Sequence, residues 1–299
     1  MAYHRPVLLK ECIEGLNITS EGTYLDLTFG GGGHSRKVLE KLGKKGRLVA
    51  FDQDPDAARN AIEDDRFLLI RANFRYMRNF LRYHGINTVD GILADLGISS
   101  YQIDQPERGF SFRTNSTLDM RMDPSSGRSA IEILNIYQES DLVRIFRDYG
   151  ELNNPGRIAR AIVRERGVQK ISTSQQLEQV LGNLVPAQSR SKFLAQVYQA
   201  VRIEVNEEME SLGEMLLQTA DYMKEGGRLV VITYHSLEDR LVKNYMRSGN
   251  LEGEIRKDFY GNTESMWKLV NRKIIVPTEE ELRENSRSRS AKLRIAEKI

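Results

Sequence analysis

Residues 23–35 read TYLDLTFGGGGHS, and this stretch decides the fold. A short apolar segment breaks into four consecutive glycines and then opens a helix. Glycine has no Cβ, so the backbone here can turn sharply and lie close to a ligand. The first N–H groups of the following helix have no partner within the helix. Strand, glycine turn and helix together predict the nucleotide-binding corner of a doubly wound α/β sheet.

The glycine pattern narrows the choice of nucleotide. A dinucleotide fingerprint requires a third glycine, and counting from Gly30 that position holds Ser35. A P-loop needs Gly-Lys-Ser/Thr after the glycines, and none follows. The next expected strand ends at Asp52, an acid about 20 residues on that can bind ribose hydroxyls. The pattern therefore fits S-adenosylmethionine at least as well as NAD. A glycine loop without a ligand is the alternative, disfavoured because four glycines are costly to order.

Composition describes an ordinary globular chain. Its 299 residues allow one large domain or two, and the net charge is only +2 with 29% charged residues. Any surface for nucleic acid must therefore be local. The single cysteine, Cys12, excludes an internal disulfide framework and a cysteine-based zinc site. Without a secretory signal or a bilayer-spanning segment, the chain is expected to be cytoplasmic.

The order of expected elements predicts two domains. Strand and helix alternate over the first hundred residues, which indicates a parallel sheet. The alternation of strand and helix stops and later resumes, so we expect a discontinuous core, 1–104 and 194–299, around a helical insertion, 105–193. The expected elements of the second core segment are a long helix at 193–223, a strand at 228–235, a helix capped by Ser236, a late strand at 268–276 and a basic tail.

Candidate site residues follow from the rule that ligands bind beyond the carboxyl ends of parallel strands. Asp95 ends the expected fourth strand and opens the loop 95–100, where we assign Asp95 and Ser99 as catalytic. An exocyclic base amine is a poor nucleophile, because its lone pair is delocalised into the ring. A carboxylate that holds its N–H groups, with in-line alignment, could supply several kcal/mol, up to about 7–11. The alternative for Asp95 is a turn capped by its own side chain. No His/Cys/Asp cluster suggests a metal.

Basic and aromatic residues suggest where RNA would bind. His34 is read equally as a cofactor contact or as an ordinary first-turn residue. A solvated face is the default for any run of charge, yet two basic runs beside an amine-methylating site favour a polyanionic substrate. The residues assigned to RNA are Arg108, Phe110, Arg157, Arg160, Arg164, His235, Arg287 and Arg289.

Long motifs also resemble a known family almost from end to end. They include DLTFGGGGHS at 26–35, DGILADLGISS at 90–100, ERGFSF at 107–112, QAVRIEVN at 199–206 and HSLEDR at 235–240. The chain resembles the bacterial 16S ribosomal RNA cytosine-N4 methyltransferases of the MraW type, which use S-adenosylmethionine. Two departures are Thr233-Tyr234, where the family pattern has Ser-Phe, and Ser116-Thr117, where it has Gly-Pro.

The resemblance implies fold, activity and partners. The fold would be a class I S-adenosylmethionine-dependent methyltransferase, a Rossmann-like α/β sheet with a helical, substrate-recognising insertion. The activity would be N4-methylation of a cytidine in the decoding centre of the small ribosomal subunit, a step of rRNA processing and ribosome biogenesis. The partner would be 16S rRNA or the 30S subunit, with no membrane, and a homodimer is one candidate state. The implied cofactor ligands are Gly32, Gly33, His34, Asp52, Phe74, Asp95 and Gln102.

Three other functions stay open at this point. An NAD-dependent oxidoreductase would use the same glycine corner. A non-catalytic RNA-binding or ribosome-assembly factor would use only the basic residues. A methyltransferase acting on DNA or protein would share the chemistry and differ in substrate.

Overall fold

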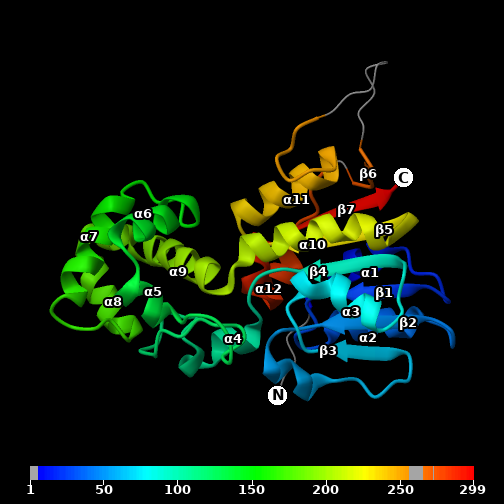
Figure 1. Cartoon of the computed structure of the whole chain (residues 1–299), viewed down its shortest axis with the longest axis horizontal. Helices are drawn as coiled ribbons and strands as arrows, with labels where there is room; N and C mark the ends of the chain where they lie inside the picture. The colour runs from blue at the N-terminus through cyan, green and yellow to red at the C-terminus, as the bar shows by residue number, and fades with distance from the viewer. Residues whose placement is uncertain (1–5, 256–264, 272) are drawn as a thin grey trace. The chain divides into compact units, whose positions relative to one another are not determined.

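The computed structural model describes residues 6–255, 265–271 and 273–299, which form two compact units. Unit 1 comprises Met1–Gly97 and Met209–Ile299, and unit 2 comprises Ile98–Glu208. Unit 1 contains the sheet and unit 2 is built mainly of helices (Figure 1). The division falls at 97/98 and 208/209, where the sequence led us to expect 104/105 and 193/194.

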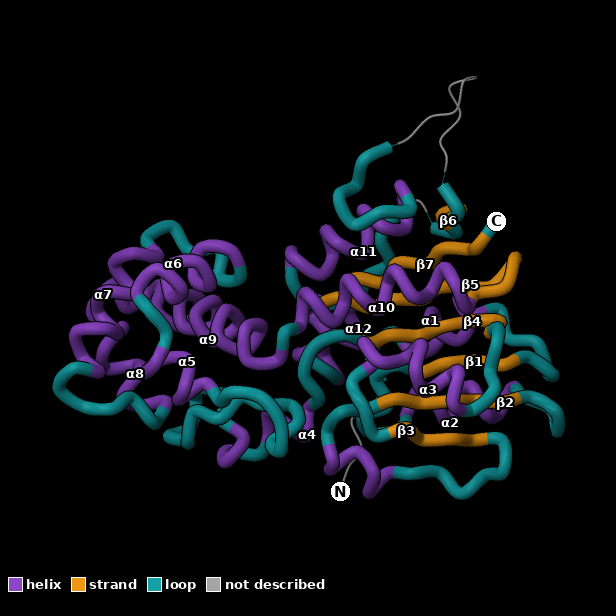
Figure 2. Tube along the Cα trace, viewed as in Figure 1, coloured by secondary structure: helices purple, strands orange, loops and turns teal. Residues whose placement is uncertain are grey.

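One mixed sheet organises unit 1. Within the described residues it has seven strands in the order β3-β2-β1-β4-β5-β7-β6, seen side by side in Figure 2. The first five run parallel, and β7 is antiparallel to both of its neighbours. The strands are β1 (Thr23–Asp26), β2 (Arg47–Phe51), β3 (Phe67–Ile70), β4 (Val89–Asp95), β5 (Met223–Thr233), β6 (Trp267–Leu269) and β7 (Lys292–Lys298). The predicted parallel α/β sheet is confirmed.

Helices cover both faces of this sheet, because alternate strand residues point to opposite sides. Leu25 and Val49 pack with α3, α10 and α11, whereas Tyr24 and Leu48 pack with α1 and α2. The helices of unit 1 are α1 (Leu9–Leu16), α2 (Gly33–Lys41), α3 (Met77–Tyr83), α10 (Glu208–Tyr222), α11 (Ser236–Ser248) and α12 (Glu279–Glu284).

Unit 2 has a hydrophobic core of its own. Phe146, Ile162 and Val197 are fully buried there and come from three different helices. Its helices are α4 (Ser100–Asp104), α5 (Ala130–Ile136), α6 (Glu139–Asp148), α7 (Pro155–Arg166), α8 (Ser174–Leu181) and α9 (Arg190–Asn206). No helix in the described parts of the chain is both long and apolar enough to span a membrane.

Three predicted elements are wrong in detail. The single long helix at 193–223 is two helices, α9 and α10, because Glu207 between them takes a left-handed conformation with φ 48°. Helix α9 then packs against α5 and α6, which explains why unit 2 extends to Glu208. Of the late strand expected at 268–276, the described residues form β6 and a bridge at Ile275, and residue 272 lies outside the described part of the chain. The supposed tail contains β7, an interior strand of the sheet.

Candidate active site

Three acids lie at the carboxyl edge of the parallel strands in unit 1. Asp26 ends β1, Asp52 directly follows β2, and Asp95 ends β4. The register pairs Asp26 with Ala50 and Leu93, so these strand ends are neighbours. The edge is the one at which open α/β sheets bind ligands, as the sequence predicted.

Asp52 is bound to the glycine loop. Its Oδ2 accepts the Gly30 N–H at 2.7 Å, and its Oδ1 accepts the Asp54 N–H at 2.8 Å. An ionised carboxylate offers about four acceptor sites, so each oxygen keeps a lone pair for a ligand hydroxyl. Asp52 can therefore support the loop and bind a ribose at the same time.

The glycines of the loop do different things. Gly30 has φ +51°, and a Cβ added there would meet nothing within 4 Å. At Gly32 the Cβ would lie 2.9 Å from the Phe29 ring, and at Gly33 it would lie 2.1 Å from Cγ of Pro6. Gly32 and Gly33 are thus required by packing, whereas the open space is at Gly30. Their predicted role as cofactor ligands, through the backbone, stays a prediction.

Helix α2 begins directly after this loop. Its N-cap, Gly32, is left-handed and makes no side-chain cap, so the first N–H groups of the helix are not satisfied by a capping side chain. Such a terminus favours an anionic group. The loop and the start of α2 therefore fit a ligand that carries a carboxylate.

His34, Asp95 and Tyr234 form a chain of polar contacts. The Tyr234 hydroxyl donates to Asp95 Oδ1 at 2.8 Å, and Asp95 Oδ2 lies 4.0 Å from His34 Nδ1. The other ring nitrogen of His34, Nε2, lies 3.1 Å from the Val7 carbonyl. The Asp95 backbone N–H donates to Thr28 Oγ1 at 2.7 Å. Tyr234 and Thr28 were missed as site residues, although Tyr234 had been noted as a departure from the family pattern.

Burial sets the protonation of these acids. It raises the pKa of Asp26, Asp52 and Asp95 from 3.8 to about 6 in each case. For Asp95 the nearby His34 and the Tyr234 hydrogen bond partly oppose that rise in pKa. Burial also lowers the pKa of His34, so its ring is neutral near pH 7. A raised carboxyl pKa in a ligand-binding edge is typical of functional sites.

Phe74 follows β3 at the same edge of the sheet. It begins the 3₁₀ turn η2 (Phe74–Tyr76), and the turn is capped by Asn73, whose side chain accepts the Arg75 N–H. The Phe74 ring is half-buried against the core beneath α3 and α10. Its position fits the predicted contact with an adenine, which stays a prediction.

Ser99 and Gln102 belong to unit 2, where they form a reciprocal cap at the start of α4. Ser99 Oγ accepts the Gln102 N–H at 3.2 Å, and Gln102 Oε1 accepts the Ser99 N–H at 2.9 Å. The described contacts give both side chains a structural role. Their catalytic and cofactor-binding roles stay predictions.

Two residues assigned to RNA are buried in unit 2. Arg108 is only 8% exposed and donates to the carbonyls of Arg121 and Met122 at 3.1 and 2.9 Å. Phe110 is equally buried within the hydrophobic core of the unit. The prediction that these two meet RNA from the surface does not fit this burial, because their groups already hold the loop around residues 119–122.

His235 has a structural role that the sequence analysis did not assign to it. It is the N-cap of α11, with its Nδ1 accepting the Glu238 N–H at 3.4 Å, and its side chain is 7% exposed. Ser236, expected to be the cap, is instead the first residue of the helix. The described geometry explains His235 as a cap and leaves its contact with RNA untested.

The remaining arginines are at the surface. Arg157, Arg160 and Arg164 are exposed on α7, and they make no hydrogen bond or ion pair with the described part of the chain. Arg287 and Arg289 are exposed in the turn η6 (Ser286–Ser290) of unit 1. Contact of these five arginines with RNA phosphates stays a prediction.

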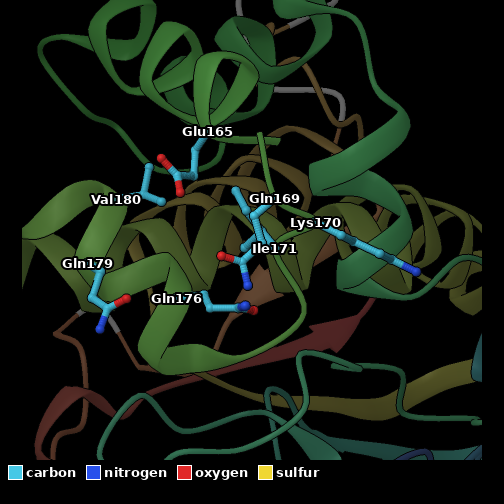
Figure 3. A pocket seen from close by; sticks show the side chains of 7 residues that line it. All are labelled: Glu165, Gln169, Lys170, Ile171, Gln176, Gln179 and Val180. Atoms are coloured by element: carbon cyan, nitrogen blue, oxygen red, sulfur yellow. The ribbon is translucent and has the colours of Figure 1, made fainter. Parts of the chain in front are cut away.

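None of the predicted site residues lines a small pocket in unit 2. It encloses about 120 Å³ between the end of α7 and α8 (Figure 3). Gln176, one of its lining residues, already accepts the Ser172 and Thr173 N–H groups. We assign this pocket no role in the chemistry.

Known proteins resemble this chain along its whole length. A family model described as the MraW methylase family matches residues 1–299. Ribosomal RNA small subunit methyltransferase H of Bacteroides thetaiotaomicron is 55% identical over 298 residues, covering 100% of this chain and 98% of that protein. The protein of that name from Flavobacterium johnsoniae is 54% identical over 299 residues, covering 100% and 99%. A solved rRNA methylase from Streptococcus thermophilus aligns with TM-score 0.41 and 11% identity over 97% of this chain and 93% of that one.

Strand order, glycine corner and relatives agree. They confirm the predicted fold class, a class I methyltransferase, and S-adenosylmethionine as the cofactor, and they exclude the NAD-dependent oxidoreductase. A family model that spans residues 1–299, with relatives more than half identical over nearly their full length, means that the chain belongs to the MraW methylase family.

Proposed function

We propose that this protein transfers a methyl group from S-adenosylmethionine to the exocyclic N4 of a cytidine in the decoding centre of 16S rRNA. The relatives' name supplies ribosomal RNA of the small subunit as the substrate class. The motifs shared with cytosine-N4 methyltransferases supply the base and its position. The geometry of Asp95 carries the proposed chemistry. This carboxylate lies at the ligand-binding edge, where its Oδ1 accepts a hydrogen bond and its Oδ2 accepts none from the described residues.

Asp95 has the properties that a base amine requires. In the transfer, N4 bonds to the methyl carbon while the carbon–sulfur bond breaks and its electron pair stays on sulfur. N4 must also lose one of its protons. With a pKa of about 6, Asp95 is mostly ionised at pH 7, so Oδ2 can accept an amine N–H and direct the lone pair toward the methyl group. We assign the released proton to the same oxygen.

The residues of unit 1 fit the cofactor. Asp52 retains acceptor sites for the ribose hydroxyls, and the uncapped start of α2 suits the methionine carboxylate. The open space at Gly30 admits the ligand close to the backbone. S-adenosylmethionine supplies the electrophilic methyl group when it is bound. This set supports the implied ligand Asp52 most directly.

Basic side chains support an RNA substrate. Arg157, Arg160 and Arg164 project from one exposed helix face without partners among the described residues. Unpaired cations of this kind contribute sequence-independent attraction to phosphates. Selection of the cytidine would then be left to the neighbouring residues of unit 2, the proposed substrate-recognition domain.

Methyl transfer to subunits that lack the modification tests the function. The substrates are 30S subunits and naked 16S rRNA from a strain without this enzyme, incubated with labelled S-adenosylmethionine. We expect N4-methylcytidine in the digested RNA, identified by nucleoside mass spectrometry. The two substrates also distinguish an assembled subunit from free RNA.

An Asp95→Ala variant is the matched control. At saturating S-adenosylmethionine it should transfer methyl at least about 100-fold more slowly than wild type. Incorporation into DNA or protein instead of RNA would replace the proposed substrate. If the variant restored every phenotype of a deletion strain, a non-catalytic assembly role would be correct.

A further inference from the structure

Tyr234 lies where it can control Asp95. Strands β4 and β5 are parallel neighbours, and the register pairs Asp95 with Ile232. Tyr234 follows β5 directly, so its side chain starts from the same edge of the sheet as Asp95. Its hydroxyl donates to Asp95 Oδ1 at 2.8 Å. Nothing in the proposed function uses this residue.

The backbone and the ring of Tyr234 are both held in place by neighbouring residues. Its backbone N–H donates to Glu238 Oε2 at 2.8 Å, and Glu238 is only 3% exposed. Its ring packs against the core beneath α1 and α2, and a Cβ added at Gly97 would lie 3.3 Å from the ring. Burial raises the pKa of Tyr234 well above its usual range, so the hydroxyl remains a donor near neutral pH.

The two oxygens of Asp95 are therefore not equivalent. Oδ1 accepts the tyrosine hydroxyl, and Oδ2 receives no hydrogen bond from any residue that the structure describes. His34 does not supply one, because the Val7 carbonyl can only accept and so requires the hydrogen of neutral His34 on Nε2. Nδ1, which lies 4.0 Å from Oδ2, then carries a lone pair.

We propose that Tyr234 is a positioning residue for methyl transfer: its hydroxyl holds one oxygen of Asp95 so that the other faces the amine of the substrate. This inference rests on the proposed function, because it assigns Oδ2 to the amine. A phenylalanine at this position, as in the family pattern, would leave the carboxylate free to rotate. In this chain the Tyr234 hydroxyl therefore holds the catalytic carboxylate, whereas the family pattern has no hydroxyl at this position.

The charged neighbours of Asp95 predict a pH effect. Burial raises the pKa of Asp95 most, and Asp26 of β1 and Glu238 of α11 raise it further, whereas the Tyr234 hydrogen bond and the protonated form of His34 in α2 lower it. Tyr234→Phe removes a lowering contribution and leaves the others in place. The pKa of Asp95 should then move above its present value of about 6, and the acidic limb of the rate profile should move to higher pH.

The test compares the full-length wild type with Tyr234→Phe in single-turnover methyl transfer between pH 5 and 8. We expect the single-turnover rate constant at pH 7 to fall about tenfold, the effect of losing one hydrogen bond to a charged group, while the concentration of S-adenosylmethionine that gives half of the maximal rate stays within about threefold. Tyr245→Phe is the matched control. It removes another buried tyrosine hydroxyl of unit 1, which lies 3.3 Å from Thr219 Oγ1, and should leave the profile unchanged.

A second measurement separates this inference from the proposed function. Carboxyl ¹³C NMR titrates Asp95 in the full chain without RNA, with Asp95→Asn as the assignment control. An upward pKa shift in Tyr234→Phe supports the positioning role even if wild-type protein methylates no cytosine, a result that would overturn only the proposed function. An unchanged pKa, or a shifted pKa with an unchanged single-turnover rate, overturns the inference.

Discussion

Hydrogen bonds to the backbone of Gly30 hold the glycine loop beside the end of the second strand. The Gly30 N–H donates to Asp52, and the Gly30 carbonyl accepts from Asn60 Nδ2 at 3.0 Å. The N–H and the carbonyl of Gly30 are therefore both hydrogen-bonded, while the side of Gly30 that would carry a Cβ faces open space. A loop fixed in this way can present its backbone to a ligand without first having to be ordered.

Gly30→Ala tests whether the cofactor uses that open space. An alanine with φ near +51° costs about 1 kcal/mol of folding stability, and its methyl group would project into the space assigned to the ligand. We expect the affinity for S-adenosylmethionine, measured by calorimetry, to fall at least about tenfold. Gly85→Ala is the control, because Gly85 also has a positive φ, +66°, with nothing within 4 Å. Equal affinity in both variants would contradict the assignment.

At the scale of the element, helix α7 shows how one sequence serves a core and a surface. Ile158, Ala159 and Ile162 are buried in unit 2, while Arg157 and Arg160 are exposed on the same helix. This division follows from the 3.6-residue period of the helix. The arginines therefore lie on a helix whose opposite face is packed into the core of unit 2.

Replacing Arg157, Arg160 and Arg164 by glutamine should weaken RNA binding through charge alone. The slope of log affinity against log salt should fall by about 2, because each lost phosphate contact on single-stranded RNA removes about 0.7. Binding of 16S rRNA fragments at several salt concentrations measures this slope. A variant with Lys41, Lys243 and Arg247 replaced by glutamine removes the same number of exposed charges from α2 and α11. Equal slopes in the two variants would refute a specific role for α7.

The elements that could be predicted from sequence are those with local signals. Alternating apolar strands and helices predicted β1 to β5, and local capping boxes at Ser129 and Thr173 begin α5 and α8. Strand β7 was missed because its cations interrupt its apolar residues. Only pairing with β5 and β6 shows that Leu293 and Ile295 are buried.

At the scale of the molecule, the site was harder to predict than the fold. The order of the strands was sufficient to place Asp52 and Asp95 at the carboxyl edge of the sheet, because the rule for ligand-binding edges depends only on topology. The role of Tyr234 depends on the register between β4 and β5, and the burial of Arg108 depends on carbonyls 13 and 14 residues away. Such contacts between distant residues have no local signature in the sequence.

The buried acids also give the whole molecule a pH-dependent stability. Asp26 is 1% exposed, and burial raises its pKa from the ordinary aspartate value of 3.8 to about 6. The folded state therefore binds more protons than the unfolded state between about pH 4 and 6. The free energy of unfolding must then decrease as pH rises through this range, by about 3 kcal/mol for this one group.

Asp26→Asn isolates that contribution, because the amide can keep both contacts of the carboxylate, with the Ser35 hydroxyl and the Thr28 N–H. Urea unfolding of both proteins at pH 4 and pH 7.5 gives the measurement. The variant should gain up to about 3 kcal/mol relative to wild type at the higher pH. Glu63→Gln, which removes an exposed carboxyl, should follow wild type at both pH values. A constant difference between Asp26→Asn and wild type would mean that Asp26 has the same pKa in the folded and unfolded states, so that its hydrogen bonds cancel the effect of its burial.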